Sequence, residues 1–161
     1  MSHPFIDIYA ITDERSSDAI NQFLKDFNNI EEIRFSDWTE VMIYKSPDRE
    51  ETEWVEVENL KNAFELGVNN TNLCFTILIG GSKEHIEWTT ITFTFDNKLV
   101  LGLSIREFQD ENGTVDNWQL AEELKKSLLA KYNSKLAVIG LAANFPFSEA
   151  DMFKLKEIWK N

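Results

Sequence analysis

The chain has 161 residues, 43% of them hydrophobic, and its 28 acidic and 16 basic residues give a net charge of −12. This length predicts a single domain over residues 1–161, which can bury a core without disulfides or structural metals. The negative charge argues against nucleic acids and anionic membranes as partners, and it favours a basic protein partner.

The first third of the chain predicts a strand, a helix and a hairpin. Residues 5–11 are β-branched and aromatic, which is typical of a strand. Apolar residues at helical spacing then predict a helix that begins after N-cap candidates in 12–18 and ends at Asn28. Residues 39–45 predict a second strand, and a short strand at 53–57 is expected to pair with it as a hairpin.

The middle of the chain predicts a short helix and an antiparallel meander. Residues 60–64 indicate a helix that Gly67 is expected to terminate. Alternating side chains then mark strands at 73–79, 86–95 and 99–103.

The register of the last two of these strands predicts the length of their loop. A two-residue loop places Thr92 opposite Leu101, which mixes polar and apolar side chains on one face. A three-residue loop shifts the pairing by one position and brings Phe93 beside the leucines. We therefore expect three residues in the loop, with Asn97 or Lys98 at positive φ.

The last third predicts two helices around one more strand. Asp116 and Gln119 have the spacing of a capping box, and an apolar stripe continues to about Tyr132. Residues 135–141 predict a buried strand. Ser148 opens the last helix as a second capping box, and the side chains expected to anchor that helix are Phe153, Ile158 and Trp159. Together the elements predict an α+β fold, with a mainly antiparallel sheet of five to seven strands and helices packed chiefly on one face.

Cysteine content and hydropathy predict a cytoplasmic protein without a membrane segment. Cys74 is the single cysteine, so the chain forms no internal disulfide and no thiolate metal cluster. The N-terminus carries no signal-peptide pattern, and apolar stretches such as 136–143 are far shorter than the roughly 20 residues of a membrane span.

The sequence contains no recognisable catalytic, cofactor or metal signature. Phosphate-loop, dinucleotide-binding, nucleophile-elbow and zinc-protease motifs are missing, so we expect no enzyme activity, no cofactor and no metal. His85 lies in a polar turn beside Glu84. Cys74 lies within an apolar strand, where a core role is more common than a reactive one.

The most distinctive local feature is a run of carboxylates around the predicted hairpin tip, with a tryptophan inside it. Such a run is usually a solvated surface, but tryptophan beside acidic residues is also typical of protein-binding patches. We therefore predict that this segment binds the basic partner. The predicted contact residues are Asp48, Glu50, Glu51, Glu53, Trp54, Glu56 and Glu58. Three further tryptophans lie near element ends, at Trp38, Trp88 and Trp118.

In its small size, its acidity and its lack of catalytic motifs, the chain resembles the immunity proteins of bacterial toxin systems, which block basic nuclease toxins. This resemblance implies an interaction protein that neutralises a basic toxin. The alternative hypothesis is a small-molecule-binding or enzymatic site assembled from scattered residues. The candidates for that site are Arg34, Glu40, Tyr44 and Arg106, because arginines in clefts often bind anions.

Overall fold

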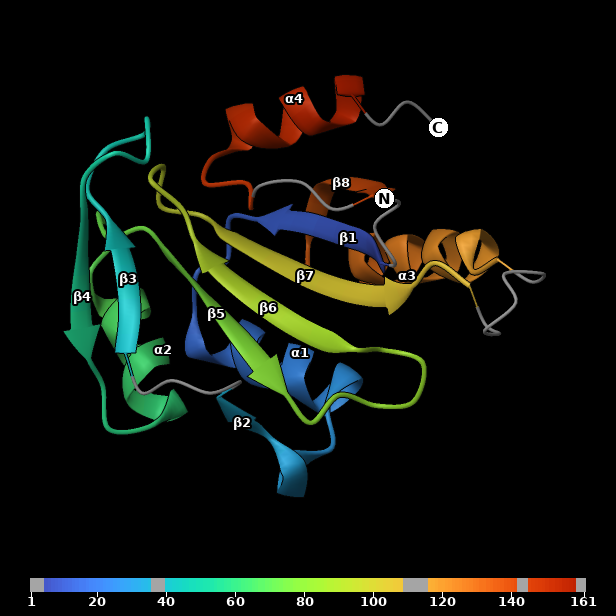
Figure 1. Ribbon diagram of the computed structural model, residues 1–161, viewed down its shortest axis with the longest axis horizontal. Helices are drawn as coiled ribbons and strands as arrows, with labels where there is room; N and C mark the ends of the chain where they lie inside the picture. The colour runs from blue at the N-terminus through green and yellow to red at the C-terminus, as the bar shows by residue number, and fades with distance from the viewer. Residues whose placement is uncertain (1–4, 36–39, 109–115, 142–144, 159–161) are drawn as a thin grey trace.

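The computed structural model describes residues 5–35, 40–108, 116–141 and 145–158, and its main feature is a six-stranded antiparallel sheet (Figure 1). The strand order is β2-β5-β6-β7-β1-β8, and every neighbouring pair is antiparallel. The strands are β1 (Phe5–Thr12), β2 (Arg34–Phe35), β5 (Phe75–Gly80), β6 (Trp88–Phe93), β7 (Leu99–Arg106) and β8 (Ser134–Leu141). The remaining strands, β3 (Glu40–Tyr44) and β4 (Thr52–Glu56), form a separate two-stranded hairpin at one end of the molecule.

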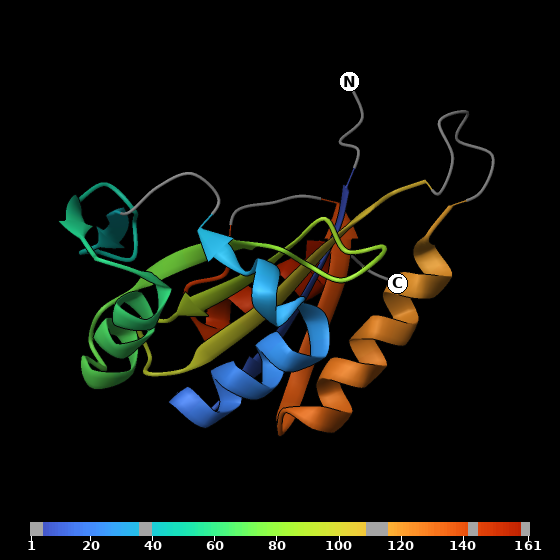
Figure 2. The ribbon, with the colours of Figure 1, turned by 90° about the horizontal axis from the view of Figure 1, so that it is seen from below.

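Three helices cover one face of the main sheet, as Figure 2 shows. They are α1 (Ser17–Phe27), α2 (Leu60–Asn69) and α3 (Trp118–Lys131). Their apolar sides join alternate residues of the strands in the larger core cluster, which includes Phe23, Phe75 and Phe93. A short 3-10 helix, Ile30–Glu32, follows α1. The predicted α+β class, the antiparallel sheet and the preference of the helices for one face are therefore confirmed.

The fourth helix, α4 (Glu149–Ile158), packs on the opposite face of the sheet. Met152 and Leu155 bury their side chains against a second apolar cluster that includes Tyr9 and Val138. The predicted anchors are wrong, because Phe153 is 53% and Ile158 is 73% exposed. Met152 and Leu155 lie three positions apart on one side of the helix, so the residues next to them in sequence turn toward solvent. The third predicted anchor, Trp159, lies outside the described residues.

The predicted register of the β6–β7 hairpin is confirmed. Phe93 pairs with Leu99 and Thr92 with Val100, and the loop between the strands holds three residues, because the Thr94 N–H donates to the Lys98 carbonyl at 3.1 Å. Asn97 has φ 60°, the left-handed conformation that this loop type requires. The register keeps the threonines together on one face of the sheet.

Side-chain caps begin α1 and α4, as the sequence predicts, but α3 begins differently. The hydroxyl oxygens of Ser16 and Ser148 accept hydrogen bonds from backbone N–H groups in the first turns of α1 and α4. The capping box predicted at Asp116 is wrong, because the N-cap is Asn117. The buried Asn117 side chain donates to the Arg106 carbonyl at 2.9 Å, which fixes the start of the helix one residue later.

Gly67 lies inside α2 rather than at its end, so the predicted terminator is wrong. A Cβ atom at this position would lie 2.4 Å from the Phe93 ring. Glycine therefore allows the helix to approach the sheet more closely than any other residue would. A sequence pattern shows only that glycine favours helix ends, whereas this contact joins segments that are far apart in the chain.

Arg15 binds the C-terminal end of α2 to the sheet. Its guanidinium group donates to the carbonyls of Gly67, Asn70 and Leu73 at distances between 2.8 and 3.0 Å, and to that of Thr94 at 2.9 Å. Burial lowers the pKa of Arg15 from its usual value. The carbonyls offset this desolvation, and several of them belong to a helix C-terminus, where a cation is favoured.

We expect the substitution Gly67→Ala to destabilise the protein, although alanine is the better helix former. Overpacking against Phe93 should lower the free energy of unfolding by about 1–3 kcal/mol, opposite in sign to the gain of roughly 1 kcal/mol that helix propensity predicts. Urea unfolding of both proteins measures the difference. Glu65→Ala, at an exposed position of the same helix, serves as the control and should change stability by less than about 0.5 kcal/mol. A more stable Gly67→Ala protein would show that helix and sheet do not pack this closely.

Candidate functional site

The β3–β4 hairpin has one face toward the core and one toward solvent. Directly opposite residues in the two strands share a face, and Val41 pairs with Val55 on the inner one. Val41 and Ile43 are buried in the main core cluster, and Val55 packs against it. These apolar contacts hold the hairpin against the body of the protein.

The outer face of the hairpin combines an indole ring with carboxylates. Trp54 is 55% exposed and lies opposite the half-buried Met42. One step further along the strands, Glu40 lies directly opposite Glu56. Like charges at such a cross-strand position destabilise a sheet, so the folded hairpin retains an unfavourable pair beside an exposed aromatic side chain.

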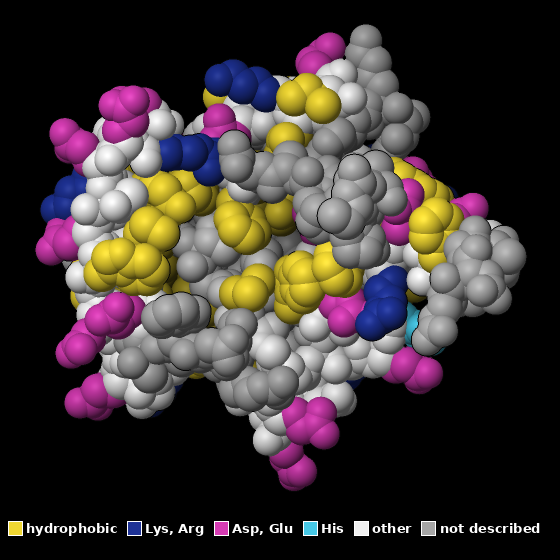
Figure 3. Space-filling model, in the orientation of Figure 1, with side chains coloured by type: hydrophobic (Ala, Val, Ile, Leu, Met, Phe, Trp, Pro, Cys, Tyr) yellow, Lys and Arg dark blue, Asp and Glu magenta, His cyan; other side chains and the backbone are white. Residues whose placement is uncertain are grey.

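All seven predicted contact residues are exposed and lie on the hairpin or at its base. They do not share one face. Trp54 and Glu56 lie on the outer face, whereas Glu53 lies on the other face and forms an ion pair with Lys45 at 2.6 Å. The others lie in the tip or just after β4: Asp48, Glu50, Glu51 and Glu58. Figure 3 shows acidic side chains along the margin of the molecule where Figure 1 places the hairpin, with hydrophobic side chains beside them.

The carboxylates of the hairpin make few contacts with basic residues. Of the seven predicted contact residues, only Glu53 forms a salt bridge within the described part of the structure. Its partner, Lys45, belongs to the hairpin itself. The carboxylate of Asp48 instead accepts hydrogen bonds from the Ser46 hydroxyl and from the Glu50 N–H, which lower the pKa of Asp48. Within the described residues, no lysine from the second half of the chain forms a salt bridge with this segment.

The hairpin is attached to the body at its tip and at the end of β3. The Tyr44 N–H donates to the Cys74 carbonyl at 2.9 Å, and the Tyr44 ring lies 4.5 Å from the Phe147 ring. Arg49, with φ 69°, turns back from the tip and stacks its guanidinium group 3.9 Å above Phe147. The same group donates to the Phe145 carbonyl at 2.6 Å and forms an ion pair with Asp151 of α4 at 3.4 Å.

The four residues of the alternative site are not brought together. Glu40 and Tyr44 lie at opposite ends of β3. Tyr44 bridges to the residue before β5, whereas Arg106 ends β7 at the other end of the meander and forms an ion pair with Glu87 at 2.7 Å. The side chain of Arg34 lies outside the described part of the structure.

His85 and Cys74, the described histidine and the cysteine, occupy ordinary structural positions and form no reactive site. His85 is exposed in a turn at φ 72°, 3.6 Å from Glu84. Cys74 is buried, as expected, and burial raises the pKa of its thiol to about 12. A thiol with so little thiolate at neutral pH is a poor nucleophile.

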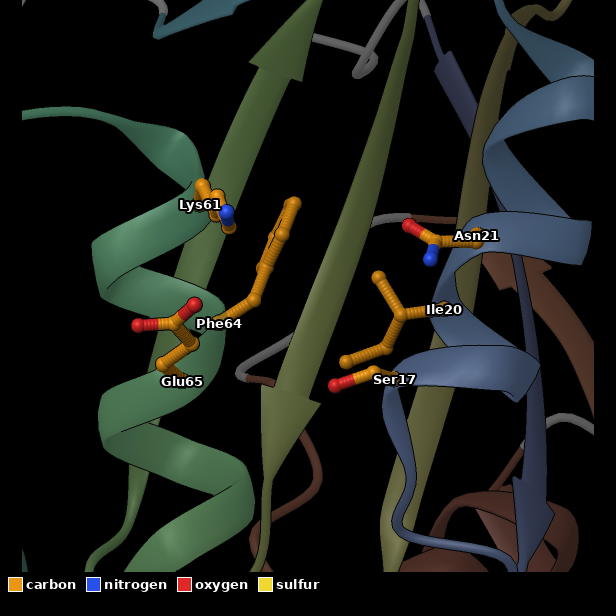
Figure 4. Close-up of a pocket in the computed structure, with 6 residues that line it drawn as sticks. All are labelled: Ser17, Ile20, Asn21, Lys61, Phe64 and Glu65. Atoms are coloured by element: carbon orange, nitrogen blue, oxygen red, sulfur yellow. The ribbon is translucent and has the colours of Figure 1, made fainter.

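A cavity of about 350 Å³ lies between α1 and α2 (Figure 4). Ile20 and Phe64 point toward each other across it, and polar side chains surround them. These are Ser17, Asn21, Lys61 and Glu65. The cavity contains no arginine and none of the residues predicted for a small-molecule site.

Asp7 is a buried carboxylate that the sequence analysis did not single out. It accepts a hydrogen bond from the buried Ser104 across the β1–β7 pair. Burial raises the pKa of the neighbouring Tyr9, and the charge of Asp7 adds to this effect. An aspartate within the apolar run of residues 5–11 was the available signal, but its polar partner lies almost 100 residues away.

Of the described tryptophans near element ends, only Trp54 is largely exposed. Trp88 packs on Phe5 with ring centroids 4.6 Å apart, and Trp118 packs against the main core cluster. Trp38 lies outside the described residues. Trp54 therefore distinguishes the hairpin from the ends of the other elements.

The fold and the site define an α+β protein with an acidic hairpin that presents an exposed tryptophan. Within the described residues, no group of three or more His, Cys, Asp and Glu side chains is arranged to hold a metal ion. No helix in that part of the chain is long and apolar enough to cross a membrane. No family model matches the chain, and neither a curated protein nor a solved structure matches it.

We expect Arg49→Ala to loosen the hairpin without unfolding the main sheet. The substitution removes the stack on Phe147 and the contacts with Asp151 and the Phe145 carbonyl. Hydrogen exchange should therefore accelerate at the amides of β3 and β4, while those of β6 and β7 keep their protection. Unchanged exchange in the hairpin would show that Arg49 does not hold it.

We expect the Cys74 thiol to react with a disulfide reagent only after unfolding. At pH 8 a thiol with a pKa of about 12 is ionised about a thousandfold less than an unperturbed cysteine. Because the thiol is also buried, Ellman's reagent should react at least about a hundredfold more slowly with the native protein than with the protein in guanidinium chloride. Equal rates would place Cys74 at the surface.

Proposed function

We propose that the protein is a non-catalytic interaction protein that binds a basic protein partner through the β3–β4 hairpin. The observation that carries this proposal is the outer face of the hairpin, where Trp54 is 55% exposed beside the like-charged pair of Glu40 and Glu56. A lysine or arginine of a partner placed between these carboxylates would relieve their repulsion. Tryptophan and arginine are also the residues that contribute most to protein interfaces.

The charge of the hairpin supports the same partner class. Residues 40–58 contain seven acidic and two basic residues. One of the two, Arg49, points back onto Phe147 rather than outward. The field at this end of the molecule is therefore negative, which accelerates the encounter with a basic protein and repels acidic ones.

We further propose that the partner is a basic toxin that this protein neutralises in the cytoplasm, in the manner of an immunity protein. An acidic hairpin with an exposed aromatic side chain is suited to the basic surface by which a nuclease toxin binds nucleic acid. A gene for a secreted toxin beside the gene for this protein would support this more specific proposal.

We expect the triple substitution Glu50→Lys, Glu51→Lys and Glu56→Lys to slow partner association about 10- to 100-fold at low salt. The partner is first isolated by affinity capture on the wild-type protein and purified. Stopped-flow kinetics then compare the two proteins at low salt and at high salt, where the difference should shrink because salt screens the charges.

A matched control makes the same change in net charge elsewhere. Glu31→Lys, Glu123→Lys and Glu157→Lys replace exposed carboxylates on three other elements, and this variant should retain most of the association rate. Equal slowing in both variants would mean that net charge matters and the hairpin does not. A captured protein that is acidic would also refute the proposal.

A further inference from the structure

In the described part of the structure, no strand pairs with the outer edge of β4. Among the described residues, β4 pairs only with β3, and Figure 1 places it at the margin of the molecule. Four of its five residues are exposed. An edge strand of this kind presents backbone donors and acceptors to any extended segment that approaches it.

The pairing pattern identifies which backbone groups face outward. The Lys45 N–H donates to the Glu51 carbonyl at 2.8 Å, so the hydrogen-bonding positions of β4 continue at every second residue, at Glu53 and Val55. The residues that alternate with these positions direct their N–H and C=O groups away from β3, to the outer edge. Tyr44 follows this rule in β3, since its N–H bonds to Cys74 on the far edge. In β4 the same rule turns the backbones of Thr52, Trp54 and Glu56 outward.

The charges beside this edge select its occupant. A second copy of the chain would bring another β4, which has two carboxylates and no basic residue, to the same edge, and the added negative charge opposes self-pairing. A segment with alternating basic residues meets opposite charges instead. A basic side chain opposite Trp54 can also lie over the exposed indole.

We propose that the basic partner binds by adding an extended, lysine- or arginine-rich strand to the outer edge of β4. This inference rests on the proposed function and specifies how the same site is used. Backbone hydrogen bonds to Thr52 and Glu56 supply the register, and the carboxylates select basic side chains. The added strand extends the hairpin from two strands to three, which stabilises it.

The first experiment uses a short, end-capped peptide in which lysine alternates with valine, with binding to the wild-type protein measured by calorimetry at low salt. Two further peptides of the same charge carry N-methyl groups on alternate residues, one on the lysines and one on the valines. Only one set of N–H groups can face β4. One methylated peptide should therefore lose about tenfold or more in affinity, while the other binds like the parent. Equal affinity of all three peptides would overturn the proposal.

A second experiment separates this proposal from the proposed function. Thr52→Pro removes an outward N–H at the first residue of β4, where proline is tolerated, and changes no charge. It should weaken binding of the parent peptide about tenfold, and hydrogen exchange at the Glu56 amide of the wild-type protein should slow on binding. If Thr52→Pro binds normally while the triple charge reversal does not, the acidic hairpin binds its partner through side chains and strand addition is wrong. If the charge reversal also binds normally, the proposed function fails as well.

Sedimentation of the protein alone should show a monomer, and a dimer with a protected Glu56 amide would assign the edge to a second copy instead.

Discussion

The attachment of the β3–β4 hairpin to the body of the protein determines everything that we infer about its surface. A two-stranded hairpin is at best marginally stable in water, so its orientation depends on contacts outside it. The bridge between Tyr44 and Cys74 fixes the end of β3, and the stack of Arg49 on Phe147 fixes the tip. Val41 and Ile43 turn the inner face of the hairpin toward the core, so the opposite face, with Trp54, points to solvent.

A second arginine, Arg15, holds the C-terminal end of α2, the helix that follows the hairpin in the chain. The chain passes from β4 directly into α2, and Arg15 binds the C-terminal carbonyls of that helix to the sheet. The absence of a side chain at Gly67 lets α2 lie against Phe93. Two half-buried arginines therefore position a segment that is mainly acidic. In both cases the guanidinium group suits the task, since it offers several donors in a fixed plane and stays charged when partly desolvated.

The hairpin combines features that lower the stability of the isolated protein. Glu40 faces Glu56 across the strands, a large indole is exposed, and no described strand pairs with the outer edge of β4. Each of these is unfavourable in the free protein and becomes favourable in contact with an extended basic segment. Proteins commonly sacrifice stability at the sites where they bind, and the position of these features together on one hairpin is what supports a binding role.

The sequence by itself determined the elements and their local chemistry. The period of the apolar residues, the Ser16 and Ser148 caps and the register that forces Asn97 to positive φ depend on neighbours within a few residues. The sequence also located the acidic hairpin and its tryptophan. Tertiary structure alone decided that α4 lies on the second face with Phe153 exposed, that Gly67 lies inside a helix, and that the face of the hairpin with Trp54 is the one turned to solvent. It also decided that Arg49 points inward and that no described strand pairs with the outer edge of β4. These outcomes depend on contacts between segments far apart in the chain, which local patterns do not contain.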